Sequence, residues 1–287
     1  MTNLVLGGVA LATMSNSELE RLLGAATLLG IDEIDTAPSY GLSEENIGRC
    51  AKKSEWKINT KIGKPHGGCP GRQEIIQSVN NSLKSLRVET INTLFIHSLP
   101  ASEISHEILD SMIDLKTSGK ILNIGYSGDG ADLHSLVREF PFDALQASLN
   151  ILDLSNYNSI VSNEKKIWYI KRPLCNQVFR IKPKLELADF VARRKNRISK
   201  DVNSYSFRYK ELFGNRILGQ MKAKKMLTFL LSLRLNASIL VGTSNIGHLN
   251  LLSQIANDPD LWDEETLEQH FIKWNRLAQL HDWRALV

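Results

Sequence analysis

The sequence predicts a (β/α)8 barrel, an α/β fold in which eight parallel strands alternate with helices. Short apolar, β-branched runs alternate with segments of helical periodicity along the 287 residues, which indicates parallel strands joined by right-handed crossovers. Eight such runs can be counted, and this barrel typically needs about 250 residues. The first turn, Leu6-Gly7-Gly8-Val9, lacks the G-x-G-x-x-G spacing of a dinucleotide-binding open sheet, so a doubly wound sheet is the weaker interpretation.

The elements of the first half follow from local signals. An apolar run predicts a strand at 4–7, and Ser15 and Glu18 then have the capping-box spacing that starts a helix. Apolar residues recur on one face of that helix until Gly30, which ends it. Further strands are expected at 31–35, 56–62 and 91–97, and a helix at 72–86.

The second half repeats this alternation and then departs from it. Helices are expected at 103–117 and 131–139, and strands at 121–126, 144–149, 167–171 and 238–241. More than sixty residues separate the last two strands, including a polar, aromatic-dotted stretch at 201–213 and a helix-like stretch at 221–235. Long segments that follow barrel strands usually carry function. We therefore expect this enlarged loop region, mainly residues 175–220, to cover a cofactor or a substrate.

Composition indicates one globular domain spanning residues 1–287, with 43% hydrophobic and 23% charged residues. The net charge of +4 would attract an anionic ligand without requiring nucleic acid. Cys50, Cys69 and Cys175 are too few for a disulfide framework, which suits a reducing cytosol. The sequence has no signal-peptide pattern and no apolar stretch of about 20 residues, so we expect a cytoplasmic protein without a membrane partner.

Polar residues gather where the expected strands end. Asp35 ends the second strand and Tyr40 follows it, Lys61 lies on the third and His97 ends the fourth. Each of them alone is more often structural, but barrel active sites form at strand ends, so the four together favour one site. A tyrosine, with a pKa near 10, becomes a proton donor when a cation tunes it. Lys61 could tune Tyr40, Asp35 could hold Lys61 and His97 could orient a carbonyl oxygen, which is an arrangement for carbonyl reduction.

Several motifs occur in order over residues 4–255. They are Asp35-Thr36-Ala37-x-x-Tyr40, the Lys61 strand, Ser82-Leu83-x-x-Leu86 leading to Ile96-His97, Gly119-Lys120-Ile121-x-x-Ile124-Gly125-x-Ser127 and Gly242-Thr243-Ser244-Asn245. In this order and spacing the chain resembles the aldo-keto reductase superfamily. The resemblance implies a (β/α)8 fold and metal-free, NADPH-dependent reduction of an aldehyde or ketone, with Tyr40 as general acid.

The resemblance also implies a site for NADPH/NADP+. Ser127 and Gln146 would hold the nicotinamide carboxamide, and Gly8 is a further cofactor-binding residue. The others would be Lys171, Arg172, Pro173 and Leu174 at the seventh strand end, Asn176 near the pyrophosphate, and Gly242, Thr243, Ser244, Asn245 and His248 at the adenosine 2′-phosphate. Some positions depart from the family pattern. Gly128 stands in place of Asn, Lys171 in place of a stacking aromatic residue, His248 in place of Arg, and Leu251-Leu252 in place of Glu-Asn.

Other interpretations stay open beside the enzyme. A non-catalytic, cofactor-sensing subunit could use the same fold. A metal site is not expected, because His66 and Cys69 lack a matching second pair of ligands. The carboxyl-terminal tryptophans are expected in the core and at the barrel bottom, with closure of the substrate pocket as the alternative. Lys171 and Arg172 would suit an anionic or sugar-like carbonyl substrate, and the oligomeric state is left open.

Overall fold

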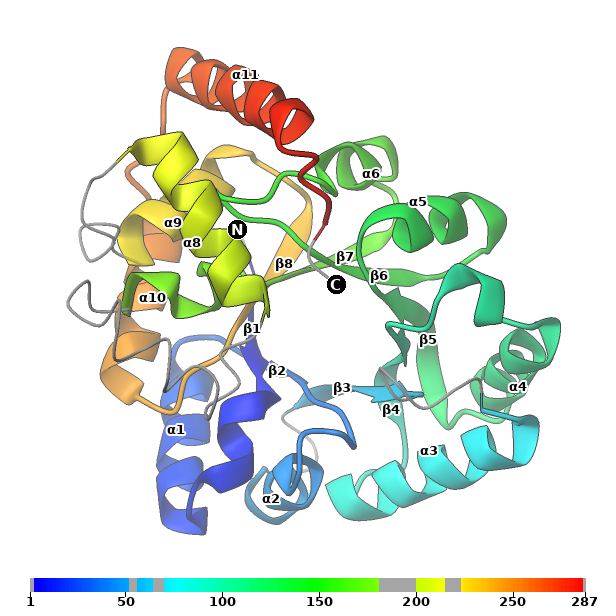
Figure 1. Cartoon of the computed structure of the whole chain (residues 1–287). Coiled ribbons are helices and arrows are strands. Elements are labelled where there is room, and N and C mark those ends of the chain that lie inside the picture. Colours follow the sequence, from blue (N-terminus) through cyan, green and yellow to red (C-terminus); the bar gives the residue numbers. More distant parts are fainter. Residues whose placement is uncertain (1–2, 52–55, 64–69, 181–199, 215–222, 286–287) are drawn as a thin grey trace, which may run out of the picture.

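In a computed structural model the strands of the protein close into a parallel barrel surrounded by helices (Figure 1). The structure describes residues 3–51, 56–63, 70–180, 200–214 and 223–285. The strands pair in chain order, and β8 pairs with β1 to close the ring. This confirms the predicted (β/α)8 class.

The strands are β1 (Leu4–Gly7), β2 (Glu33–Asp35), β3 (Lys57–Ile62), β4 (Ile91–His97), β5 (Ile121–Ser127), β6 (Ala144–Ser148), β7 (Ile167–Lys171) and β8 (Ala237–Val241). The α-helices are α1 (Asn16–Leu28), α2 (Ser43–Cys50), α3 (Arg72–Leu86), α4 (His106–Thr117), α5 (Gly130–Glu139), α6 (Tyr157–Ser162), α8 (Lys200–Phe213), α9 (Ala223–Ser232), α10 (Ile246–Asn257) and α11 (Glu264–Leu280). Short 3-10 helices are η1 (Gly8–Thr13), η2 (Ala101–Glu103) and η3 (Cys175–Arg180).

The predicted element bounds are close to those observed, and the differences have local causes. The capping box of Ser15 and Glu18 starts α1 as expected. The helix expected from residue 103 begins at His106, because the Ser105 side chain accepts a hydrogen bond from the Ile108 amide and caps it there. Residues 201–213, interpreted as part of a loop, belong to α8. Tyr205, Tyr209 and Leu212 form the buried face of this helix, whereas Phe207 is exposed.

Side chains fill the barrel interior, so the barrel is a core and not a pore. Phe95 and Tyr169 meet edge to face inside it, with ring centroids 5.5 Å apart. At the amino-terminal end the Glu33 carboxylate accepts hydrogen bonds of 2.6 Å from both the Tyr169 hydroxyl and the Asn59 amide. Burial raises the pKa of Glu33. These contacts close the interior and leave the carboxyl end of the strands as the place for chemistry.

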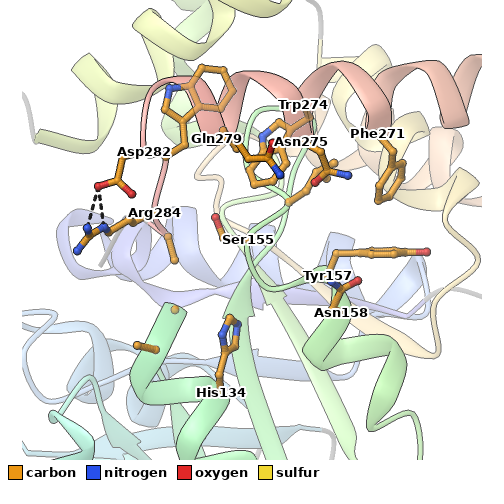
Figure 2. A pocket seen from close by; sticks show the side chains of 16 residues that line it. His134, Ser155, Tyr157, Asn158, Phe271, Trp274, Asn275, Gln279, Asp282 and Arg284 are labelled. Carbon is orange, nitrogen blue, oxygen red and sulfur yellow. Dashed lines mark hydrogen bonds and ion pairs between the residues drawn. The ribbon is translucent and has the colours of Figure 1, made fainter.

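The carboxyl-terminal region packs on the loop after β6. The Trp274 indole donates to the Leu152 carbonyl oxygen at 3.2 Å, and His270 hydrogen-bonds to the Ile151 carbonyl at 2.9 Å. Both carbonyls follow the carboxyl end of β6, so the expectation that this region packs at the barrel bottom is wrong. Between α5, α6 and α11 lies a cavity of about 680 Å³, into which Tyr157 and Asn275 project (Figure 2). No described helix is long and apolar enough to cross a membrane.

Candidate active site

The strand-end residues Asp35, Lys61 and His97 meet Tyr40 at the carboxyl end of the barrel. The Lys61 ammonium lies 2.6 Å from Asp35 Oδ2 and donates a second hydrogen bond of 2.8 Å to the Thr36 carbonyl oxygen. The same ammonium is 5.2 Å from the centroid of the Tyr40 ring. The Tyr40 and His97 rings meet edge to face at 6.1 Å. The structure therefore brings together all four residues that the sequence singled out.

The turn between β2 and α2 positions Tyr40. The Tyr40 amide donates to the Ala37 carbonyl at 3.0 Å. The Thr36 hydroxyl donates to the Ser43 hydroxyl, which donates to the Gly8 carbonyl, both at 2.8 Å. A Cβ on Gly8 would lie 2.9 Å from three atoms of this turn, so only glycine lets β1 approach it this closely. The space beside Gly8 is thus filled by the chain itself.

Burial and the neighbouring charges set the protonation states in the site. Burial raises the pKa of Tyr40, and the Lys61 charge opposes that shift. The pKa of Lys61 is raised. Burial acts to lower it, but the interactions with Asp35 and Tyr40 outweigh burial, so the lysine stays charged. Burial, reinforced by the charges of Lys61 and Lys171, lowers the pKa of His97 to about 3. At neutral pH the site therefore holds a protonated phenol, an ammonium and a neutral imidazole.

Ser127 and Gln146 connect to the same network. The Ser127 hydroxyl donates to Gln146 Oε1 at 2.7 Å, and Gln146 Nε2 donates to Asp35 Oδ1 at 2.8 Å. All three side chains are buried. Asp35 therefore accepts from Gln146 on one oxygen and from Lys61 on the other, a link between distant residues that the sequence analysis did not anticipate.

A second ion pair, of a partly buried lysine and a buried aspartate, lies on the opposite side of the mouth. Lys171 ends β7, and its ammonium is 2.9 Å from Asp129 Oδ2. Asp129 also accepts from the Ser148 amide at 2.6 Å and from the Asn156 side chain at 2.9 Å. Sequence reasoning missed Asp129, although its position two residues beyond the strand-end Ser127 is a usable signal.

The turn from β8 into α10 presents polar groups at the same end of the barrel. Asn245 caps α10 by accepting a 3.0 Å hydrogen bond from the His248 amide, and the Thr243 hydroxyl accepts from the Asn245 amide at 3.1 Å. Ser244 and His248 are exposed, and nothing lies within 4 Å of a Cβ built on Gly242. This is an accessible helix start with hydroxyl and amide donors.

Comparison with known proteins identifies the family. The model of the aldo/keto reductase family matches residues 3–167, which is more than half of the chain. The chain belongs to the aldo/keto reductase family. An aldo-keto reductase of Mycobacterium avium (strain 104) is 32% identical over 139 residues, or 46% of this chain and 47% of that protein. The L-glyceraldehyde 3-phosphate reductase of Escherichia coli (strain K12) is 29% identical over 153 residues, 46% and 44% of the two chains.

These matches span about half the length of the curated relatives. A solved structure extends the likeness over the whole fold. The aldo-keto reductase from Klebsiella pneumoniae, solved in complex with NADPH, has a TM-score of 0.70 and covers 100% of this chain and 95% of that chain. Its sequence is 16% identical, so this likeness shows the fold alone.

One departure of this chain from the family pattern has a packing cause. A Cβ on Gly128 would lie 2.4 Å from the ring and hydroxyl of Tyr126. The Tyr126 hydroxyl donates to the Leu99 carbonyl at 2.9 Å, which fixes the ring there. The asparagine expected at position 128 therefore cannot fit beside this tyrosine.

The remaining predicted cofactor residues lie along the segment after β7. Arg172 is half-buried with a φ of 58°, Pro173 is buried and Leu174 is partly buried, whereas Asn176 is exposed with a φ of 50°. Of the candidate covering segment, residues 181–199 and 215–220 lie outside the described part of the chain, as do His66 and Cys69. Among described residues, no three His, Cys, Asp or Glu side chains group closely enough to hold a metal ion.

Proposed function

We propose that this protein is an NADPH-dependent oxidoreductase that reduces an aldehyde or ketone to an alcohol. The observation that carries the proposal is the Lys61 ammonium, which is held by Asp35 at 2.6 Å and lies against the Tyr40 ring. A protonated phenol with a fixed cation beside it can donate its proton to a carbonyl oxygen, because the cation stabilises the phenolate left behind.

Tyr40 is the general acid in this proposal, and His97 orients the substrate. Because the pKa of His97 is lowered to about 3, the imidazole is neutral and does not compete with Tyr40 as a proton donor. His97 Nδ1 is buried and makes no hydrogen bond to any described residue, so no described group fixes which ring nitrogen carries the proton. Lys61 and Asp35 act through Tyr40, and Gln146 fixes Asp35.

The residues at the β8–α10 turn fit a phosphate-bearing cofactor. The first α10 hydrogen bond runs from the Leu249 amide to Asn245, so the amides of Ile246 and Gly247 precede the helical ladder. Free amides at a helix start, with hydroxyls such as that of Ser244, bind anions. NADPH bound there would supply the hydride, while the residues of this chain hold it, orient the carbonyl and deliver the proton.

The substrate class proposed is a small carbonyl compound, anionic or sugar-like. Arg172 and Lys171 lie at the mouth, and the Arg172 charge is close enough to act on the pKa of Tyr40. Cations at this place favour a carboxylate or phosphate group on the substrate. The likeness to a reductase named for L-glyceraldehyde 3-phosphate supports this class.

The test is NADPH consumption by the purified protein with a panel of aldehydes and ketones, matched in size and differing in charge. We expect turnover, fastest with anionic or hydroxylated members, and its loss in Tyr40→Phe. NADPH binding without turnover of any member would instead support the cofactor-sensing alternative. Absence of NADPH binding would contradict both.

A further inference from the structure

In the Lys171–Asp129 pair, the positive charge is partly exposed at the barrel mouth and the negative charge is buried. Lys171 keeps 17% of its side chain exposed, whereas Asp129 is 1% exposed. The Asp129 carboxylate is enclosed by its other donors, which are the Ser148 amide and hydroxyl and the Asn156 side chain. The positive member of the pair is therefore the one that meets a molecule in the mouth.

The charge of Lys171 reaches the reacting groups. It contributes to the lowered pKa of His97, and Lys61 in turn contributes to the lowered pKa of Lys171. A carbonyl that accepts a proton from Tyr40 has its carbon next to these residues. The nicotinamide ring that delivers a hydride to that carbon must lie in the same space.

Hydride transfer changes the charge of that ring. NADPH bound here would supply a hydride from its neutral dihydronicotinamide to the carbonyl carbon, with the proton for the oxygen coming from Tyr40, and its oxidised ring would be a cationic pyridinium. A fixed ammonium nearby repels the pyridinium and leaves the dihydronicotinamide almost unaffected. A protein group shifts such an equilibrium by the difference in its interaction with the two forms.

We propose that Lys171 makes the site discriminate between the redox forms of the cofactor, so that NADPH binds more tightly than NADP+ and the oxidised form is released. This inference rests on the proposed NADPH-dependent function. It assigns to Lys171 a specificity-determining role, with Asp129 as the residue that positions and partly offsets its charge.

The test measures the Kd of NADPH, NADP+ and 2′-phospho-ADP-ribose, which lacks the nicotinamide, by calorimetry at pH 7. Lys171→Met leaves the Asp129 carboxylate without its ammonium partner. We therefore expect the ratio of the NADP+ Kd to the NADPH Kd to fall by about tenfold. Asp129→Asn leaves the ammonium without its carboxylate partner, so the same ratio of Kd values should rise by a few-fold. Lys171→Arg keeps the charge and should keep the wild-type ratio.

Two controls separate this electrostatic role from a structural one. Binding of 2′-phospho-ADP-ribose should stay unchanged in all variants, and Lys57→Met, which removes an exposed lysine paired with Asp32 at 2.9 Å, should leave the ratio unchanged. If the wild-type protein binds neither cofactor, the proposed function fails. If it binds both but Lys171→Met and Asp129→Asn give the wild-type ratio, or weaken all three ligands equally, the inference about Lys171 is overturned.

Discussion

The mouth of the barrel contains two lysine–aspartate pairs, one fully buried and one with a partly exposed lysine. Lys61 pairs with Asp35 across the neighbouring strands β3 and β2, at 2.6 Å and with both side chains buried. Lys171 ends β7 and pairs at 2.9 Å with Asp129, which follows β5. The pKa of Lys61 is raised and that of Lys171 is lowered. In two pairs of the same residue types, the lysine pKa is thus shifted in opposite directions.

The difference comes from what surrounds each ammonium. Lys61 also donates to the Thr36 carbonyl and adjoins the Tyr40 hydroxyl, groups that favour its charged form. Burial lowers the pKa of Lys171, and the positive charges of Arg172 and Lys61 lower it further. The groups around each ammonium therefore determine the direction in which its pKa shifts. The first pair lies beside the Tyr40 phenol, and the second leaves part of its lysine exposed at the mouth.

The largest expected effect comes from removing the phenol that the first pair serves. Tyr40→Phe should lower kcat by about 10²–10⁴-fold, the usual contribution of a general acid, while NADPH binding changes by no more than a few-fold. A hundredfold loss corresponds to about 2.7 kcal/mol of transition-state stabilisation. Steady-state kinetics measures kcat. Tyr157→Phe, in the cavity beside α11, is the matched control and should keep wild-type turnover. Unchanged turnover in Tyr40→Phe would mean that another group supplies the proton.

Removing the lysine of each pair should separate the role of Lys61 in proton donation by Tyr40 from the role of Lys171 in cofactor binding. Lys61→Met should cripple carbonyl reduction and raise the apparent pKa of the acid step, because Tyr40 loses its neighbouring cation. Asp35→Asn should do less harm, since an amide oxygen can still accept from Lys61. Lys171→Met should change kcat by only a few-fold. The pH profiles of kcat for the three variants check this order, which a greater loss in Asp35→Asn than in Lys61→Met would contradict.

Alkaline titration should show the two pairs losing their protons in a fixed order. The folded pKa of Lys171 is lowered, so as pH rises Lys171 should deprotonate before an unfolded lysine, whose pKa is near 10.4. Between the folded and the unfolded pKa, Lys171 binds more protons in the unfolded chain than in the folded protein. Its contribution to the free energy of unfolding therefore rises with pH in that range. Lys61 behaves oppositely, and its stabilising contribution is lost only as pH rises through its raised folded pKa. NMR of labelled lysine side chains measures both; Lys61 titrating first would contradict the comparison.

The sequence predicted the first pair and missed the second for a physical reason. Asp35, Lys61 and His97 come from successive strands, whose parallel register places their carboxyl ends side by side, so a strand count was enough. Asp129 lies beyond its strand and reaches Lys171 across the intervening β6. Which side chain fills that space depends on packing, which no local pattern encodes.

Contacts between elements that are distant in the sequence could not be predicted either. Gln146 meets Asp35 across 111 positions of sequence, and the resemblance assigned it only to the nicotinamide. The aromatic residues of α8 were interpreted as loop residues because their inward face is completed by the distant β6–α6 loop, where Tyr205 accepts from Asn150. The predicted roles of the other cofactor residues stay predictions.

The smallest expected effect lies at the β8–α10 turn, away from both pairs. His248 lies exposed in the first turn of α10, with its amide bonded to Asn245. His248→Arg places a permanent, bidentate cation where a 2′-phosphate would meet the helix start. NADPH should then bind about 3–10-fold more tightly, roughly 1 kcal/mol, and NADH, which lacks that phosphate, should be unaffected. Fluorescence titration of both cofactors at low and high salt measures the change, which salt should reduce. An equal gain for NADH would mean that this turn does not contact the phosphate, and the site of the adenosine would have to be sought elsewhere along the mouth.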